Sequence, residues 1–170
     1  IVPFSFNSNL TTISPVKIYL KSQDISQSFY GQGEENLEIA KFNFYTQASS
    51  AGLSGIKLKL LGNTTDSDLT SVKLKKDEII IASGVFKNYS LDLTFSTQTI
   101  SIATQTYTLV VDISSTANSG NTFSIEITSA TSLKLEKFGI TRVEAPYINF
   151  PATTKLIEIL DKRTPTPPQI

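Results

Sequence analysis

Apolar and polar residues alternate with a period of two along most of this 170-residue chain. Ile and Leu alternate with Lys through residues 56–60, and Tyr89, Leu91, Leu93 and Phe95 alternate with polar residues in the same way. Because successive side chains of a strand point to opposite faces, this pattern predicts strands that bury one face. No segment carries the apolar stripe of an amphipathic helix. Further strands are predicted at residues 16–21, 39–45, 72–75, 78–82, 100–102, 107–113, 123–127, 133–136, 147–150 and 155–160.

Short clusters of Gly, Asn and Ser separate many of these predicted strands, and such clusters are typical of turns. Roughly ten short strands at near-regular spacing predict an all-β fold, a two-sheet antiparallel β-sandwich of the Ig-like or jelly-roll kind. We place this sandwich at residues 13–161. Extended terminal segments flank it: an N-terminal strand with its tether at residues 1–12, and a proline-rich tail at residues 162–170.

Cys, His, Met and Trp are all absent from the sequence. A chain without His or Cys has no imidazole base, no thiol nucleophile and no thiolate zinc site, so we expect that this protein is not an enzyme. The 15 Lys and Arg residues balance the 15 Asp and Glu residues. No long-range field would therefore attract nucleic acid. No apolar run approaches the length of a membrane span.

The N-terminus begins with an apolar alternating segment that contains Ile1, Val2, Phe4 and Phe6. In an extended chain, Val2, Phe4 and Phe6 share one face, and a polar stretch follows them. Two interpretations stay open. The segment is the first strand of its own sandwich, or it adds to the open sheet edge of a neighbouring copy, where Pro3 is tolerated. The second interpretation, donor-strand complementation, predicts a head-to-tail homopolymer that does not close.

Two carboxylates lie one residue apart in the loop that contains Asp66 and Asp68. Oxygen ligands at such a spacing can serve calcium, although the glycine and the distal glutamate of an EF-hand loop are missing. A solvated turn is therefore the favoured interpretation. Calcium at these two residues is the only cofactor for which the sequence offers candidates.

Three Asn-x-Ser/Thr triplets offer candidate N-glycan acceptors at Asn9, Asn63 and Asn88. Asn63 and Asn88 fall in predicted turns, where a glycan has room. The triplets are relevant only if the protein is exported, and a chain rich in Ser, Thr and Asn also produces them by chance.

Residues 93–127 contain, in order, a strand, a Thr-x-Thr-Tyr run that leads into Val-Asp-Ile-Ser, and a Gly-x-Thr-Phe turn. This pattern resembles the Ig-like sandwich domains of prokaryotic surface-layer and surface-filament proteins. Residues 39–44 and 63–74 are similar to the same family, so the resemblance covers about residues 36–130. In kind, the chain is similar to cannula-like and TasA-like fibre proteins. That resemblance implies sandwich subunits that are joined by donated strands.

The sequence thus predicts a structural subunit of an extracellular filament, tube or surface layer, with other copies of itself as partners. The alternative is an adhesive or carbohydrate-binding domain of a larger cell-surface protein, with glycans as partners. The aromatic candidates for that alternative are Tyr19 and Tyr45, which we expect to face outward, and Tyr30, which lies next to Gly31. Both interpretations place the protein outside the cell or at its surface.

Overall fold

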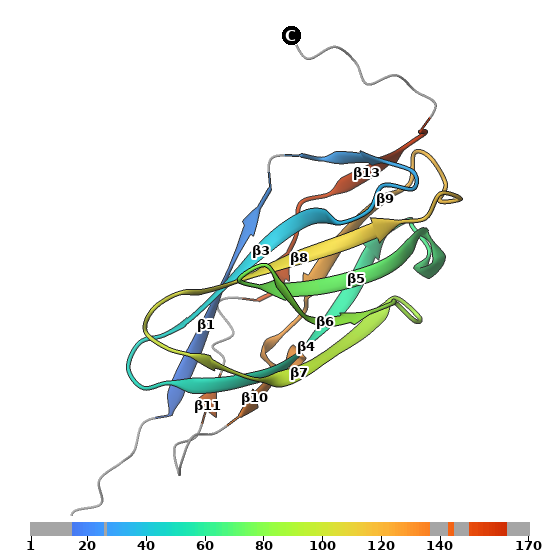
Figure 1. The fold of residues 1–170 in the computed structure, drawn as a ribbon. Coiled ribbons are helices and arrows are strands. Elements are labelled where there is room, and N and C mark those ends of the chain that lie inside the picture. Colours follow the sequence, from blue (N-terminus) through green and yellow to red (C-terminus); the bar gives the residue numbers. More distant parts are fainter. Residues whose placement is uncertain (1–14, 26, 137–142, 145–149, 163–170) are drawn as a thin grey trace, which may run out of the picture.

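The computed structural model describes residues 15–25, 27–136, 143–144 and 150–162 (Figure 1). Within these residues, the chain forms thirteen β-strands and two 3-10 helices, η1 (Asp66–Asp68) and η2 (Ala130–Ser132). The strands form two sheets, which confirms the predicted all-β sandwich. The predicted N-terminal strand and most of the proline-rich tail lie outside the described residues. The described part contains no helix with the length and hydropathy that a membrane crossing requires.

The first sheet has six strands in the order β11-β1-β3-β8-β5-β6. Neighbouring strands are antiparallel except for β1 and β11, where Val16 pairs with Val143 in parallel. The strand β6 lies at one edge of this sheet, and β11 lies at the other. The bounds are β1 (Val16–Asp24), β3 (Leu37–Thr46), β5 (Leu69–Lys76), β6 (Ile79–Gly84), β8 (Gln105–Ile113) and β11 (Val143–Glu144).

The second sheet has seven strands around the long strand β4, which pairs with β7 on one side and with β10 and β9 on the other. The strand β9 pairs in turn with β12 and β13, and β13 pairs in parallel with β2 at the far edge. The bounds are β2 (Phe29–Gly31), β4 (Ala51–Gly62), β7 (Ser90–Ile100), β9 (Thr122–Ile127), β10 (Leu133–Glu136), β12 (Ala152–Thr153) and β13 (Ile157–Leu160).

The two parallel pairs correct the prediction of a purely antiparallel sandwich. Each pair joins a strand near one end of the chain to a short strand far away in sequence. A parallel pair needs a long connection between its strands, and here most of the sandwich itself supplies that connection. Both sheets are therefore mixed, without a crossover helix.

The inward faces of the two sheets form one apolar core. Ile56, Leu58 and Leu60 are buried while Lys57 and Lys59 are exposed, as the alternation predicts. Large side chains fill the middle of this core, and the rings of Phe44 and Tyr107 meet edge to face at 5.5 Å. Burial of such side chains contributes most of the stability of a sandwich without disulfides.

Tyr89 departs from the predicted pattern. Leu91, Leu93 and Phe95 are buried, but the side chain of Tyr89 is 49% exposed. The reason is a tight turn, because Lys87 and Ser90 exchange two backbone hydrogen bonds and both residues between them have positive φ. The strand β7 therefore begins at Ser90, and Tyr89 does not share its inward face.

A polar network covers part of the outer face of the six-stranded sheet. Lys73 Nζ lies 2.6 Å from Asp112 Oδ2 and 2.9 Å from Asn36 Oδ1, and the Asn36 backbone N–H donates to Asp112 Oδ1 at 2.6 Å. Burial acts to raise the pKa of Asp112. The hydrogen bonds from Asn36, Lys73 and Ser71 and the charge of Lys73 outweigh burial, so this pKa lies below its ordinary value.

Candidate assembly edge

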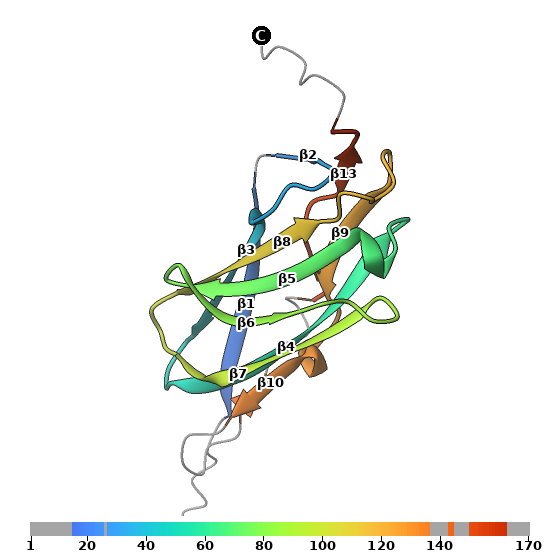
Figure 2. The ribbon, with the colours of Figure 1, turned by 45° about the vertical axis from the view of Figure 1, so that its right-hand side comes forward.

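The strand β6 is the outermost strand of the six-stranded sheet beyond β5. It forms a ladder with β5 on one side, and in the described part of the chain no strand pairs with its other side. The edge strand β7 of the second sheet lies next to it, as two views of the ribbon show (Figures 1 and 2). We call this side of the sandwich the β6–β7 edge, comprising residues 79–90 and the facing part of β7.

Exposed apolar side chains concentrate at this edge. Of the seven large apolar side chains exposed in the described residues, four lie between residues 79 and 89: Ile79, Ile80, Val85 and Tyr89. Ile79 is 68% exposed and Ile80 is 51% exposed. The strand contains no Lys, Arg, Asp, Glu or Pro. Natural proteins usually protect a free edge with such residues. The only protective feature of β6 is the register irregularity opposite Leu74 and Lys75.

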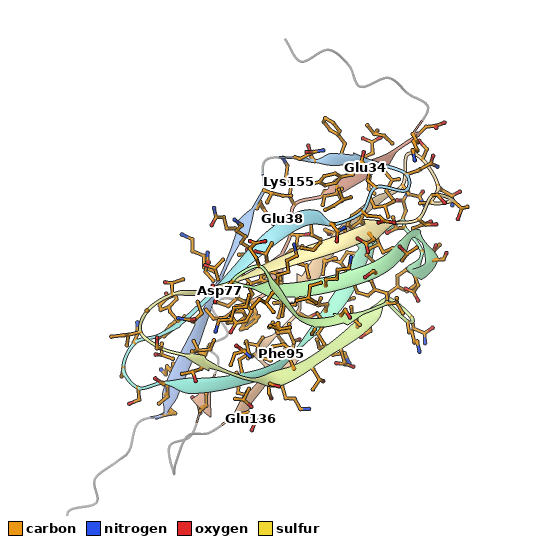
Figure 3. The ribbon with its side chains drawn as sticks, viewed as in Figure 1. Glu34, Glu38, Asp77, Phe95, Glu136 and Lys155 are labelled. Carbon is orange, nitrogen blue, oxygen red and sulfur yellow. The ribbon has the colours of Figure 1, made fainter. Side chains whose placement is uncertain are left out.

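A hollow of about 410 Å³ lies where β6 passes into β7, lined by residues that include Gly84, Val85, Leu91 and Asp92. A Cβ at Gly84 would lie 2.6 Å from Leu91 Cδ1, so any side chain there would displace Leu91. Further along β7, the buried ring of Phe95 lies between the ribbons of β6 and β7 in Figure 3. The edge thus has an apolar rim that continues into the core.

The opposite end of this edge is closed by polar contacts between the sheets. Lys76 Nζ of β5 donates to Gln98 Oε1 of β7 at 3.2 Å and lies 5.7 Å from the centre of the Tyr107 ring. The Tyr107 hydroxyl is buried, and no described residue hydrogen-bonds it. Burial, together with the charge of Asp77, raises the pKa of Tyr107 to about 12. The amino group of Lys76 thus joins the two sheets at the position where their edge strands separate.

This arrangement is suited to β-addition. The free side of β6 presents backbone N–H and C=O groups that can pair with an added strand. The isoleucines at its start offer apolar surface that an incoming strand can cover. The apolar run of residues 79–82 predicted a strand at residues 78–82. It did not predict that the strand would lie at an edge, because a run buried on both faces has the same sequence pattern.

The residues of the predicted donor strand, Ile1, Val2, Phe4 and Phe6, lie outside the described residues, as does Asn9. The structure therefore shows the candidate acceptor edge and not the predicted donor strand. Asn63 and Asn88 are both exposed, as a glycan acceptor requires. Asn63 Oδ1 accepts hydrogen bonds from the backbone N–H and the hydroxyl of Thr122.

The two carboxylates considered for calcium have structural partners. Asp68 is buried, and its Oδ2 accepts from the Thr65 backbone N–H at 2.8 Å and from Asn121 Nδ2 at 3.4 Å. Asp66 Oδ1 accepts from the Tyr89 backbone N–H at 2.9 Å. These bonds hold loops together, and the described residues contain no group of three or more acidic side chains that could hold a metal ion.

Tyr19 and Tyr45 face outward on the six-stranded sheet, where their rings stack with centres 5.3 Å apart. Both side chains are half-buried, and the Tyr19 hydroxyl donates to Gln47 Oε1 at 2.9 Å. Each ring covers one face of the other. The pair is thus a poorer platform for a sugar than two separate exposed rings would be.

A scan against protein-family models and a search of curated proteins find no match to this chain. A search of solved structures finds, among others, the sporulation control protein Spo0M from Bacillus subtilis. The identity is 13% and the TM-score is 0.38, over 87% of this chain and 50% of that one. This chain thus spans half the length of that protein, and the similarity is too low to support an argument about fold or function.

Proposed function

We propose that this protein is a structural, non-enzymatic subunit of an extracellular filament, tube or surface layer. Subunits join by donor-strand complementation, in which residues 1–6 of one copy add to the free side of β6 in the next. The observation that carries the proposal is the exposed apolar β6 strand without a protecting charge or proline. The apolar alternation of Ile1, Val2, Phe4 and Phe6 supplies the matching strand.

The position of the described N-terminal end supports a head-to-tail arrangement. The strand β1 begins at Val16, near the β11 edge, whereas β6 forms the opposite edge of the same sheet. Four inter-strand steps separate β1 from β6, a distance of about 19 Å at the usual strand spacing. A donor that leaves near one edge and an acceptor at the other make a heterologous contact, which repeats without closing.

The absence of Cys and Met supports an oxidising, extracellular location, because these are the side chains that oxidants damage first. The resemblance of residues 36–130 to surface-layer and surface-filament domains favours the same location. The tyrosine pair gives little support to the adhesive or carbohydrate-binding alternative, because Tyr19 and Tyr45 stack on each other and each ring covers one face of the other.

Two variants test the proposal, one in the donor strand and one in the acceptor strand of the predicted contact between subunits. Deletion of residues 1–8 removes the donor, and Ile80→Lys places a charge on the acceptor strand. We expect the unaltered chain to form filaments under negative-stain imaging and both variants to stay monomeric with an unchanged far-UV spectrum. Ile102→Lys, at a site 69% exposed and away from this edge, is the control that still assembles.

Assembly by the deletion variant, or unimpaired assembly by Ile80→Lys, would contradict the proposal. Pairing of the N-terminal strand with β6 of its own chain must also be distinguished from pairing between two copies. Residues 7–15 reach about 30 Å when fully extended, which is enough for pairing within one chain. In that case the unaltered protein stays monomeric at all concentrations. Added peptide of residues 1–8 then binds only to the deletion variant, with no filament formed by mixing.

A further inference from the structure

A second surface feature lies on the outer face of the seven-stranded sheet and adjoins the β6–β7 edge at Tyr89 and Ser90. Two adjoining hollows, of about 340 and 280 Å³, cross β4 between β7 and β10 and share Lys57 and Ser132. The first also reaches Thr94 and Lys134, and the second ends at Tyr89. We call the two hollows together the outer groove.

The lining of the outer groove includes Gly55, which has no side chain. A Cβ at Gly55 would lie 2.9 Å from the Leu93 carbonyl oxygen and 3.3 Å from Lys134 Cβ, so a side chain has no room there. Both ladders of β4 shift register beside this glycine, one with β7 and one with β10. The backbone path at Gly55 and the side chain of Lys134, whose Cδ would lie 3.4 Å from that Cβ, thus shape this part of the groove together.

Three lysines, Lys57, Lys59 and Lys134, project from the outer groove into solvent. The nearest carboxylate contact joins Lys57 Nζ to Asp92 Oδ2 at 4.0 Å, with both side chains more than half exposed. In the part of the chain that the structure describes, no carboxylate lies within 4.0 Å of Lys59 or Lys134. Glu126, which pairs with Lys59 in the ladder, accepts instead from the Thr153 hydroxyl at 3.2 Å. A protein of zero net charge thus has a locally cationic groove.

Tyr89 stands at one end of the groove in a backbone conformation that aromatic residues rarely adopt. Its φ is +60° and that of Asn88 is +51°, the signs that a type I′ turn requires at both central positions. Glycine usually occupies the second of these positions, and a bulky residue there is an outlier. The fold keeps Tyr89 in place through Asp66 Oδ1, which accepts from its N–H, and through Leu60 N–H, which donates to its carbonyl at 2.9 Å.

A residue held in a strained conformation while its side chain stays exposed points to a function for that side chain. Tyr89 offers an amphipathic ring on which a sugar can stack, and the lysines offer flexible charges for carboxylates. The hydroxyls of Thr131 and Ser132 add hydrogen-bonding groups on the opposite rim. The shallow groove crosses the sheet and suits a chain-like ligand.

We propose that the outer groove binds an acidic polysaccharide. Its sugar ring stacks on Tyr89, and its carboxylates pair with Lys57, Lys59 and Lys134. A polyhydroxylated ligand fits the hydroxyl-rich rim better than a nucleic acid does. Single-stranded nucleic acid is bound through several stacking platforms and a continuous basic track, and this groove has one aromatic ring and three lysines.

The direct test is a calorimetric titration of the full chain with hexagalacturonate and with its methyl ester. The two hexamers share one backbone, and only the first is charged. We expect saturable binding of the acid, weakened by salt, and several-fold weaker binding of the ester. Equal affinity for both, or no binding of the acid, would overturn the proposal. Tighter binding of a single-stranded DNA of similar length would overturn the ligand class.

Variants then locate the site. Tyr89→Gly relieves the backbone and should leave the fold intact while it weakens hexagalacturonate binding about tenfold, the scale of one lost aromatic contact. The double change Lys57→Gln and Lys59→Gln should weaken binding and flatten its salt dependence. Lys21→Gln, on the outer face of the other sheet, is the matched control. Unchanged binding by Tyr89→Gly, or an equal loss in the control, would contradict the assignment.

Discussion

A lysine faces an aspartate across neighbouring strands on the outer surface of each sheet, and the two pairs differ. Lys73 and Asp112, on β5 and β8, meet at 2.6 Å with side chains only 18% and 12% exposed. Lys57 and Asp92, on β4 and β7, lie 4.0 Å apart with side chains 57% and 72% exposed. The first pair has a third partner, the backbone N–H of Asn36, and the second lies beside the open groove. The surroundings, and not the two residue types, decide whether such a pair stabilises the fold.

The largest expected difference between the two pairs is in folding stability. Asp112→Ala leaves the largely buried Lys73 without its carboxylate and removes the acceptor of the Asn36 N–H. We expect the free energy of unfolding to fall by about 2–3 kcal/mol. Urea unfolding at constant m-value measures it. A loss as small as that of an exposed pair would show that the network of Asp112 does not stabilise the sheet.

The Lys73–Asp112 pair should also make the stability of the protein depend on pH. Because the folded-state pKa of Asp112 is lowered, its stabilising contribution is fully present above the ordinary aspartate pKa, near 4. That contribution is lost as the pH falls through the lower folded-state value. The stability advantage of the unaltered protein over Asp112→Asn should therefore shrink between about pH 5 and about pH 2. A constant difference across that range would contradict the lowered pKa.

The alternation of apolar and polar residues was sufficient to predict the two-sheet sandwich and most of its long strands, such as residues 56–60 and 107–113. It missed the short strands β2, β11 and β12, because two or three residues cannot display a period. The network of Asp112 depends on the register between β5 and β8 and on a loop residue 76 positions away. Neither can be read from local sequence. Tyr89 was misplaced for the same reason, since its turn conformation interrupts the alternation.

At the outer groove, one substitution is expected to raise the free energy of unfolding. Tyr89→Gly replaces an aromatic residue at φ +60° with the residue that adopts this conformation without steric cost. We expect the free energy of unfolding to rise by about 0.5–1 kcal/mol, because the relieved strain exceeds the added flexibility of the unfolded chain. Thermal unfolding measures the shift. A destabilised Tyr89→Gly would mean that the ring packs on the fold, and would remove the argument that it is kept for a ligand.

The smallest effect is expected at the second pair. Asp92→Ala breaks a solvent-exposed contact at 4.0 Å and should change stability by no more than about 0.5 kcal/mol. The same urea titration used for Asp112→Ala applies. A loss of similar size to that of Asp112→Ala would mean that the outer faces of the two sheets do not differ as their exposures indicate.

The described chain enters the sandwich at β1 and leaves it at β13, and these two positions lie at opposite ends of the molecule (Figures 1 and 2). Tension applied between these two points acts nearly along the strand axes. The hydrogen bonds that hold β1 and β13 in their sheets are then loaded in shear. They must break together, and they cannot unzip one after another. Resistance to pulling in such a module depends on strand direction as well as on its free energy of unfolding.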